Sequence, residues 1–192
     1  MRVYLAGPDV FLPDPIARAA ALKAICARHG LVGVSPLDAL EAEPPAWREL
    51  TEARAIALRN EAHIAGCAAL IANLTPFRGP SADAGTVFEL GFMRALGRPV
   101  FGWSNTRRGF TDRTLDFLGG AARRGADGAW IDSEGMAIEA FGLADNLMLE
   151  GAVLASGGAL VTAEVAPASR WRDLGAFESC VAEAARRLAC ER

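Results

Sequence analysis

The sequence lacks several features that mark common classes of protein. No run of about 18 uninterrupted apolar residues occurs, so a membrane span is not expected. Its 20 Lys and Arg are outnumbered by 23 Asp and Glu, whereas a nucleic-acid surface needs clustered cations. We therefore expect neither a membrane nor a nucleic acid as a partner. The 192 residues fit one domain, and an apolar share of 52% is enough to build its core.

Histidine and cysteine are too few and too scattered for the usual metal or nucleophile sites. The four cysteines, at positions 26, 67, 180 and 190, show neither metal-binding spacing nor a dense disulfide framework. The two histidines, His29 and His63, are too few for a zinc enzyme or a Ser-His-Asp hydrolase. We interpret the cysteines as reduced thiols of a cytoplasmic protein, and we expect any catalysis to use carboxylates.

Apolar runs and helical stripes alternate along the first hundred residues. Strands are predicted at 2–6, 31–34, 68–74 and 98–103, and helices at 14–28, 48–66 and 84–96. This order predicts an α/β fold: a single Rossmann-like or flavodoxin-like domain whose parallel sheet is flanked by helices.

The rest of the chain carries weaker patterns. We expect a mobile loop or short helix at 104–128, short strands and turns at 129–165, and a closing helix at 177–188. The whole chain, 1–192, is expected to form one domain, with 154–192 as a strand and helix extension.

Two loops at the carboxyl ends of predicted strands are the place where a ligand would bind. The loop at 7–11 lacks the Gly-x-Gly-x-x-Gly pattern of dinucleotide sites, and the loop at 75–86 lacks the P-loop pattern. The second loop still ends in Gly85 and Thr86, which place a small residue and free backbone N–H groups at a helix start. An anionic or oxygen-rich ligand can approach there.

Glu89 lies one turn further along the predicted helix. Its neighbours at helical spacing are small or apolar, and desolvation among them would make it a more reactive nucleophile or base. The alternative is a surface glutamate on an ordinary amphipathic helix, which the pattern alone favours. Asp83 has a structural alternative as the helix N-cap, and Tyr4 has one as a buried strand residue.

Four motifs together resemble the nucleoside 2-deoxyribosyltransferases. They are YLAGP at 4–8, NLTPFRGP at 73–80, DAGTVFELG at 83–91 and DNLM at 145–148. The similarity runs in order from about residue 3 to residue 153. The D-x-G-T-x-x-E-x-G element alone is moderately specific, and its combination with the first and last motifs is much more so.

The resemblance implies a role for each matching residue. Glu89 would be the nucleophile, Tyr4 would hold it in place, and Asp83 would meet the leaving base. Asn146 and Met148 would bind the sugar in the site of a neighbouring subunit, so a homo-oligomer is expected.

Further residues are expected to contact the substrate. Gly7 and Gly85 would lie against it, and Phe11 resembles the aromatic residue that lines the base pocket. Some members carry another base-contacting aspartate on the second helix, where this sequence has Asn60. This departure bears on how protons reach the base and on the choice between purines and pyrimidines.

The resemblance implies transfer of 2-deoxyribose between nucleobases through a covalent glycosyl-Glu89 intermediate, with no metal and no cofactor. The partners would be a deoxynucleoside and a free nucleobase. One alternative is a nucleoside or nucleotide N-glycoside hydrolase, for which Arg78 and Ser81 could surround a phosphate. Another is a non-catalytic nucleotide-sensing module, which would keep the pocket without requiring Glu89.

Overall fold

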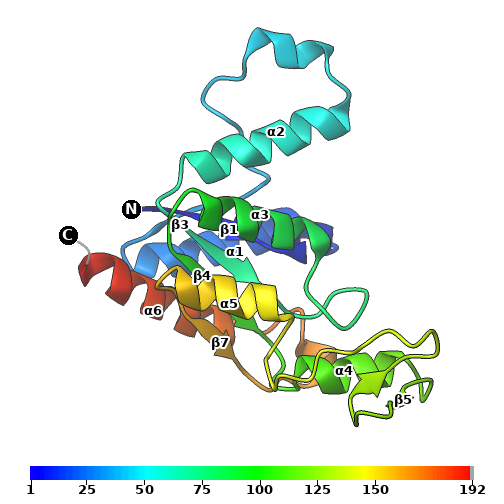
Figure 1. The fold of residues 1–192 in the computed structure, drawn as a ribbon. Coiled ribbons are helices and arrows are strands. Elements are labelled where there is room, and N and C mark those ends of the chain that lie inside the picture. The colour runs from blue at the N-terminus through cyan, green and yellow to red at the C-terminus, as the bar shows by residue number, and fades with distance from the viewer. Residues whose placement is uncertain (191–192) are drawn as a thin grey trace.

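A five-stranded sheet forms the centre of the computed structural model, which describes residues 1–190 (Figure 1). Its strands lie in the order β2-β1-β3-β4-β7, and each neighbouring pair runs parallel. The strands are β1 (Arg2–Ala6), β2 (Val32–Val34), β3 (Ala69–Asn73), β4 (Val100–Ser104) and β7 (Leu160–Thr162). The predicted α/β fold with a parallel sheet is confirmed.

Helices cover both faces of this sheet. One face packs against α1 (Pro15–Arg28) and α6 (Gly175–Cys190). The other packs against α2 (Glu52–Ala65), α3 (Ala84–Ala95) and α5 (Leu147–Ala155), and Figure 1 shows α3 and α5 side by side. Burial on both faces explains why the strands are apolar runs rather than alternating patterns.

The alternation of side chains along β1 decides which residue faces the α3 side. Val3 and Leu5 belong to the core under α1 and α6, while Tyr4 and Ala6 belong to the core under α3. Successive strand residues point to opposite faces, so the hydroxyl-bearing residue of β1 is aimed at α3. The register pairs Tyr4 with Val34 of β2 and Leu70 of β3.

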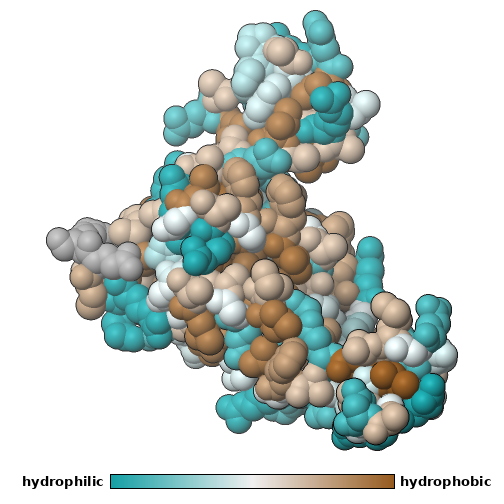
Figure 2. Space-filling view, in the orientation of Figure 1, coloured by the Kyte–Doolittle hydropathy of each residue, from teal (hydrophilic) through white to brown (hydrophobic). Residues whose placement is uncertain are grey.

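Two segments extend away from the sheet (Figures 1 and 2). One precedes α2 and contains the 3-10 helix η2 (Pro45–Glu49). The other contains α4 (Phe110–Phe117) and a small hairpin of β5 (Arg123–Arg124) and β6 (Trp130–Ile131). The helix α4 agrees with the short helix expected within 104–128.

Two sequence expectations were wrong in part. The helix expected at 48–66 begins only at Glu52, because the Pro44-Pro45 pair sets up the separate turn of η2. Helix α5 lies where only strands and turns were expected. It has nine residues, LMLEGAVLA, and its charged side chains are limited to Glu150, so no amphipathic period marks it.

The C-terminal extension completes the core. Strand β7 pairs with β4, and α6 buries Phe177 and Cys180 against the sheet. The four cysteines are free thiols, of which Cys190 alone is exposed. Within residues 1–190, no helix has both the length and the apolar character that a bilayer crossing requires.

Candidate active site

A tyrosine and a glutamate meet between β1 and α3. The Tyr4 hydroxyl donates a hydrogen bond of 2.7 Å to Glu89 Oε1. The Tyr4 side chain is completely buried, whereas Glu89 keeps partial access to solvent. The buried strand therefore holds the carboxylate from below and leaves part of it open to a ligand.

The surroundings of Glu89 change its protonation. The pKa of this carboxyl is raised from 4.5 to about 7. Burial is the largest cause, the hydrogen bond from Tyr4 opposes it, and the nearby Asp83 carboxylate adds to it. Burial, followed by the charge of Glu89 and the hydrogen bond to it, raises the pKa of Tyr4, so its hydroxyl remains a donor. Near neutral pH, Glu89 is thus poised between its neutral form and the anion that a nucleophile needs.

Asp83 is the N-cap of α3, the structural role that the sequence offered as an alternative to contact with the substrate. Its Oδ2 accepts hydrogen bonds from the Thr86 backbone N–H at 3.0 Å and from Thr86 Oγ1 at 3.1 Å. The hydrogen bonds that the Asp83 carboxylate accepts within residues 1–190 all go to Oδ2, so Oδ1 is free for a ligand. A Cβ at Gly85 would lie 3.1 Å from this Oδ2, so a glycine leaves room around the cap. Capping and a role toward a leaving base are compatible.

Phe11 and Asn60 line a separate cavity of about 660 Å³, whose other walls include Leu37, Ile56 and Arg59. This volume is typical of a small-molecule site. Phe11 is 58% exposed and stacks on Phe77, with ring centroids 5.5 Å apart and planes at 11°.

The Asn60 side chain carries an unused acceptor. Its Oδ1 is buried and has no hydrogen-bond partner among the described residues. A buried polar atom without a partner is unfavourable, and an amino group on a ligand could satisfy it. The structure thus brings Phe11 and Asn60 together, although Glu89 is not among the residues that line their cavity.

Gly7 allows a close approach at the end of β1. A Cβ at this position would lie 2.7 Å from Asn73 Cβ and 2.8 Å from Asp9 Oδ2. Asp9 accepts hydrogen bonds from Arg18 Nε at 2.7 Å and from Asn73 Nδ2 at 2.8 Å, and it is buried. This network fixes the loop that leads to Phe11.

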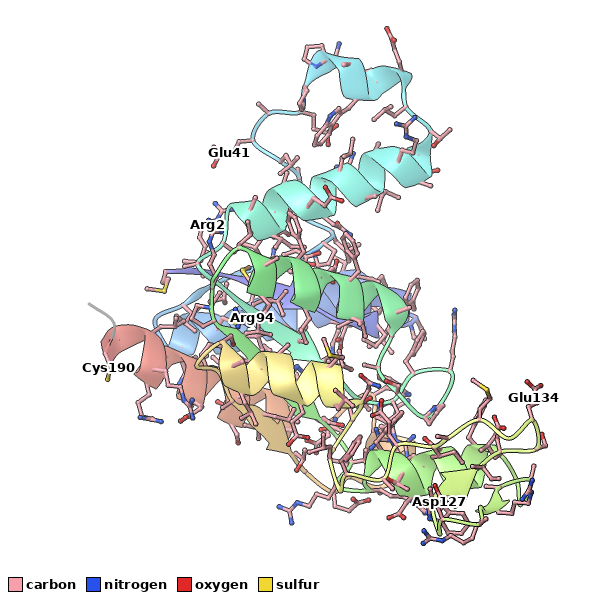
Figure 3. All side chains as sticks on the ribbon, in the orientation of Figure 1. Arg2, Glu41, Arg94, Asp127, Glu134 and Cys190 are labelled. Atoms are coloured by element: carbon pink, nitrogen blue, oxygen red, sulfur yellow. The ribbon has the colours of Figure 1, made fainter. Side chains whose placement is uncertain are left out.

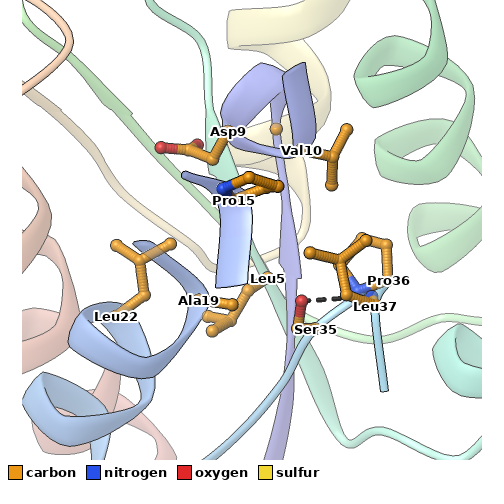
Figure 4. Close-up of a pocket in the computed structure, with 10 residues that line it drawn as sticks. Leu5, Asp9, Val10, Pro15, Ala19, Leu22, Ser35, Pro36 and Leu37 are labelled. Atoms are coloured by element: carbon orange, nitrogen blue, oxygen red, sulfur yellow. Dashed lines mark hydrogen bonds between the residues drawn. The ribbon is translucent and has the colours of Figure 1, made fainter. Parts of the chain in front are cut away.

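Sequence reasoning did not identify the buried network of Asp9, Arg18 and Asn73. Its signals were an aspartate directly after Gly-Pro and one arginine within the apolar stripe of α1. Figure 4 shows a crevice beside Asp9, between Val10, Pro15 and Leu37. Its volume of about 10 Å³ has room for one water at most, so it is not a ligand site.

Asn146 and Met148 lie at the start of α5. Asn146 is the N-cap: its Oδ1 accepts a 3.0 Å hydrogen bond from the Met148 backbone N–H, and its Nδ2 donates to Glu139 Oε1 at 2.6 Å. The Met148 side chain is 69% exposed. The chain therefore presents the pair at its surface.

Met148 lines a groove between α3 and α5 rather than the Glu89 side of α3. The α3 residues in this groove include Val87, Gly91 and Arg94, the last of which is labelled in Figure 3. At about 100° per residue, these positions lie roughly opposite Glu89 around the helix axis. One copy of the chain does not bring Met148 to its own Glu89.

Asp145 links the loop before Asp83 to the start of α5. Its Oδ1 accepts from Ser81 Oγ and from the Asn146 backbone N–H, and its Oδ2 accepts from Arg113 at 3.1 Å. Burial raises the pKa of Asp145, and these hydrogen bonds and the charge of Arg113 oppose it. Sequence reasoning gave Asp145 no role, although it begins the DNLM motif. Ser81, which could surround a phosphate in the hydrolase alternative, instead donates its hydroxyl hydrogen bond to Asp145.

The described part of the chain contains no group of three or more His, Cys, Asp or Glu placed to hold a metal ion.

The fold and the site define an α/β protein in which a tyrosine of the central sheet holds a partly buried carboxylate beside a helix start. Comparison with known proteins places it more narrowly. The family model described as nucleoside 2-deoxyribosyltransferase matches residues 3–148. The chain belongs to the nucleoside 2-deoxyribosyltransferase family.

Individual proteins are similar to this chain in sequence or in structure. An uncharacterised protein of Schizosaccharomyces pombe is 33% identical over 165 residues, which cover 81% of this chain and 78% of that protein. The structure of a 2-desoxiribosyltransferase from Leishmania mexicana is similar with a TM-score of 0.56 and 34% identity, over 77% of this chain and 84% of that one. A conserved protein from Enterococcus faecalis shares the fold, with a TM-score of 0.51, 20% identity, and coverage of 85% and 91%.

Proposed function

We propose that the protein is a nucleoside 2-deoxyribosyltransferase that moves 2-deoxyribose between nucleobases through a covalent glycosyl-Glu89 intermediate. The observation that carries this proposal is the 2.7 Å hydrogen bond between Tyr4 and Glu89. It holds one oxygen of a partly desolvated carboxylate and leaves the other free to react. Family membership and the name of the Leishmania relative support the same activity.

In the first step, an oxygen of the Glu89 carboxylate forms a bond to C1′ of the sugar as the bond from C1′ to the base nitrogen breaks. The transition state resembles an oxocarbenium ion, and the negative carboxylate on the opposite face stabilises its charge. The electron pair of the broken bond leaves with the base. Asp83 in its protonated form would pass a proton to the departing base, become a carboxylate, and so make the base a better leaving group.

In the second step, a nitrogen of an incoming base attacks C1′ and the ester to Glu89 breaks. The proton lost by the incoming base would return to Asp83, which restores the enzyme. Two displacements retain the configuration at C1′. Water can replace the second base, so slow hydrolysis of the intermediate is expected.

The cavity that contains Phe11 and Asn60 supplies features that suit base recognition. The exposed ring of Phe11 offers a stacking surface, and the buried Asn60 Oδ1 offers an acceptor to an amino group. The aspartate that the resemblance places here in some family members could also gain a proton, whereas the side chain of Asn60 cannot. Asn60 would therefore contact the base without exchanging protons with it.

The placement of Met148 supports an oligomeric enzyme. Met148 is exposed and lies on the far side of α3 from Glu89. Asn146 and Met148 would thus complete the site of a neighbouring subunit. We further propose that the whole chain acts as one domain, because β7 extends the sheet that carries Tyr4 and α6 packs on that sheet. The interpretation of the four cysteines as reduced thiols supports a location in the cytoplasm.

A base-exchange assay tests the proposal. The protein is incubated with a panel of deoxynucleosides, with and without free acceptor bases, and the products are separated by chromatography. Exchange should require an acceptor and should vanish in Glu89→Gln. A matched control is Glu134→Gln, which changes an exposed glutamate far from the site (Figure 3).

The same assay separates the alternative functions. If the base is released but no new nucleoside forms when acceptor bases are present, the protein is a hydrolase and the transfer reaction is contradicted. Mass spectrometry of the protein with a donor should show one added deoxyribosyl group, absent in Glu89→Gln. No adduct and no turnover with any donor would favour the sensing module.

A further inference from the structure

A second cavity, distinct from the one beside Phe11 and Asn60, is lined by four arginines. Its volume is about 540 Å³. Its walls come from the loop at 76–80, from the segment after β4 and from the segment before α6. The arginines are Arg78, Arg108, Arg113 and Arg170, and the acidic side chains in the lining are limited to Asp116.

Two of these arginines are paired with carboxylates. Arg108 lies 2.7 Å from Asp116, and this pair is largely exposed. Arg113 is nine-tenths buried and bonds to Asp145 and to the Pro80 carbonyl oxygen. The interactions of Arg113 explain its presence without any ligand.

The other two have no carboxylate partner among residues 1–190. Arg170 Nε is buried and makes no hydrogen bond with the described part of the chain. Burial lowers the pKa of Arg113, Asp145 raises it, and the charge of Arg170 lowers it again, so the two guanidinium groups are close enough to repel each other. An anion between them would remove this repulsion and satisfy the buried N–H.

Arg78, which lines the cavity, has an uncommon backbone conformation. Its φ of 56° lies in the left-handed region that arginine seldom adopts. The guanidinium carbon lies 4.6 Å from the Phe77 ring centroid and 5.3 Å from that of Phe11. Contact with ring faces leaves the N–H groups at the guanidinium edge free to bind an anion.

The position of Phe77 connects the two cavities. One cavity includes Phe77 in its wall, and the other includes Phe11, whose ring stacks on Phe77. Three residues beyond Pro80, the same loop reaches Asp83. The anion site therefore adjoins the region where the proposed function places a base and a sugar.

We propose that this arginine cavity binds the 5′-phosphate of the substrate, so that the donors are deoxynucleoside 5′-monophosphates. Several guanidinium groups are the usual partners of a phosphate dianion. The volume exceeds the needs of a lone phosphate and suits an ion that is part of a larger ligand. The identity of the donor rests on the proposed function, whereas phosphate binding does not.

Binding is measured by calorimetry at one fixed ionic strength with five probes. These are deoxyadenosine, deoxycytidine, their 5′-monophosphates and inorganic phosphate. At least one monophosphate should bind about ten- to a hundredfold more tightly than its own nucleoside, the range expected for hydrogen bonds to a charged group. Arg170→Gln should remove that difference, and Arg107→Gln should keep it. Arg107 is the matched control because it is exposed, adjoins Arg108 and is absent from the lining.

The outcomes test whether the arginine cavity binds a phosphate and whether that phosphate belongs to the substrate. Equal affinity for nucleotides and nucleosides, or a difference that survives Arg170→Gln, overturns the proposal. Inorganic phosphate should compete with the bound nucleotide. Phosphate that binds without competing would indicate a separate anion site and would overturn the assignment to the substrate.

A kinetic measurement distinguishes this inference from the proposed function. In the base-exchange assay, the ratio of kcat/KM for a monophosphate to kcat/KM for its nucleoside should exceed about ten. This ratio cancels any loss of folded protein, and it should fall in Arg170→Gln. Exchange with a ratio near one overturns the phosphate site and leaves the transferase. Tight nucleotide binding without exchange supports the phosphate site and contradicts the transferase.

Discussion

The Tyr4 hydroxyl and Glu89 Oε1 lie 2.7 Å apart, although 85 positions separate the two residues in the chain. Tyr4 is completely buried, so water does not compete for its proton. The hydrogen bond favours the charged carboxylate while burial opposes it. This one contact therefore influences both the position and the ionisation of the proposed nucleophile.

Replacement of Tyr4 by phenylalanine should slow formation of the glycosyl-enzyme by about ten- to a hundredfold at neutral pH, because a hydrogen bond to a charged group is lost. The bond lowers the pKa of Glu89, so its loss should also move the pH midpoint of this step upward. Single-turnover kinetics over a range of pH values measure both effects. A slower rate with an unchanged midpoint would contradict the electrostatic part of this role.

The pH dependence of the native enzyme should follow the ionisation of Glu89. With a pKa of about 7, the reactive anion increases about tenfold between about pH 6 and about pH 8, and the single-turnover rate should increase with it. A rate that falls over this interval would show that another group limits the step.

Glu89→Gln should be more stable than the native protein above neutral pH. The folded-state pKa of Glu89 lies above its ordinary value of 4.5, so its favourable contribution is present below about pH 4.5 and is lost as the pH rises through about 7. Glutamine cannot ionise and can still accept the Tyr4 hydrogen bond. Chemical denaturation at about pH 8 should show a gain on the order of 1–3 kcal/mol, which vanishes in acid. An equal gain at both pH values would contradict this origin.

Mixed oligomers should recover activity from two inactive variants. Glu89→Gln lacks the nucleophile, and an Asn146→Ala/Met148→Ala double variant lacks the residues proposed to act in a neighbour's site. Random dimers of the two should regain about a quarter of native activity, because half are hybrids that each hold one intact site. Base exchange before and after mixing measures this recovery. No recovery, with mixing shown by native mass spectrometry, would place Asn146 and Met148 in their own chain's site.

Gly7→Ala should destabilise the protein, because the added Cβ would lie 2.7 Å from Asn73 Cβ and 2.8 Å from Asp9 Oδ2. We expect a loss of about 1–3 kcal/mol, measured by denaturant unfolding. Gly151→Ala is the matched control. It lies within α5 with open space around its Cβ position, and it should stabilise the helix by about 0.5–1 kcal/mol. A neutral effect of Gly7→Ala would show that the loop can move.

Much of the fold could be predicted because each element depends on local pattern. Buried runs predicted the strands at 2–6 and 68–74, and Asp14-Pro15 marked the start of α1, where the Asp14 carboxylate accepts a 3.1 Å hydrogen bond from the Ala17 backbone N–H. Helix α5 was missed because it is short and mostly apolar. Its start depends on Asn146, and a cap is recognisable only once a helix is suspected.

The candidate site was only partly accessible from pattern. Spacing along α3 places Asp83 and Glu89 on neighbouring turns, but their chemistry favoured an N-cap and a surface glutamate. Only the family resemblance predicted that Tyr4 is a partner of Glu89, since periodicity carries no information across 85 positions. For the same reason, the link from Arg113 to Asp145 could not be foreseen, because it joins α4 to the segment before α5, and these meet only in the folded chain.

The register of β1 also decides where the molecule can move. Tyr4 lies between Val34 of β2 and Leu70 of β3, so the backbone at this point can open only if both ladders break. Amide hydrogens here should exchange at rates set by global unfolding, in contrast to those of the loop at 75–83. Motions that admit a substrate or release a product must then arise in the loops, while the strand beneath the carboxylate stays fixed through every turnover.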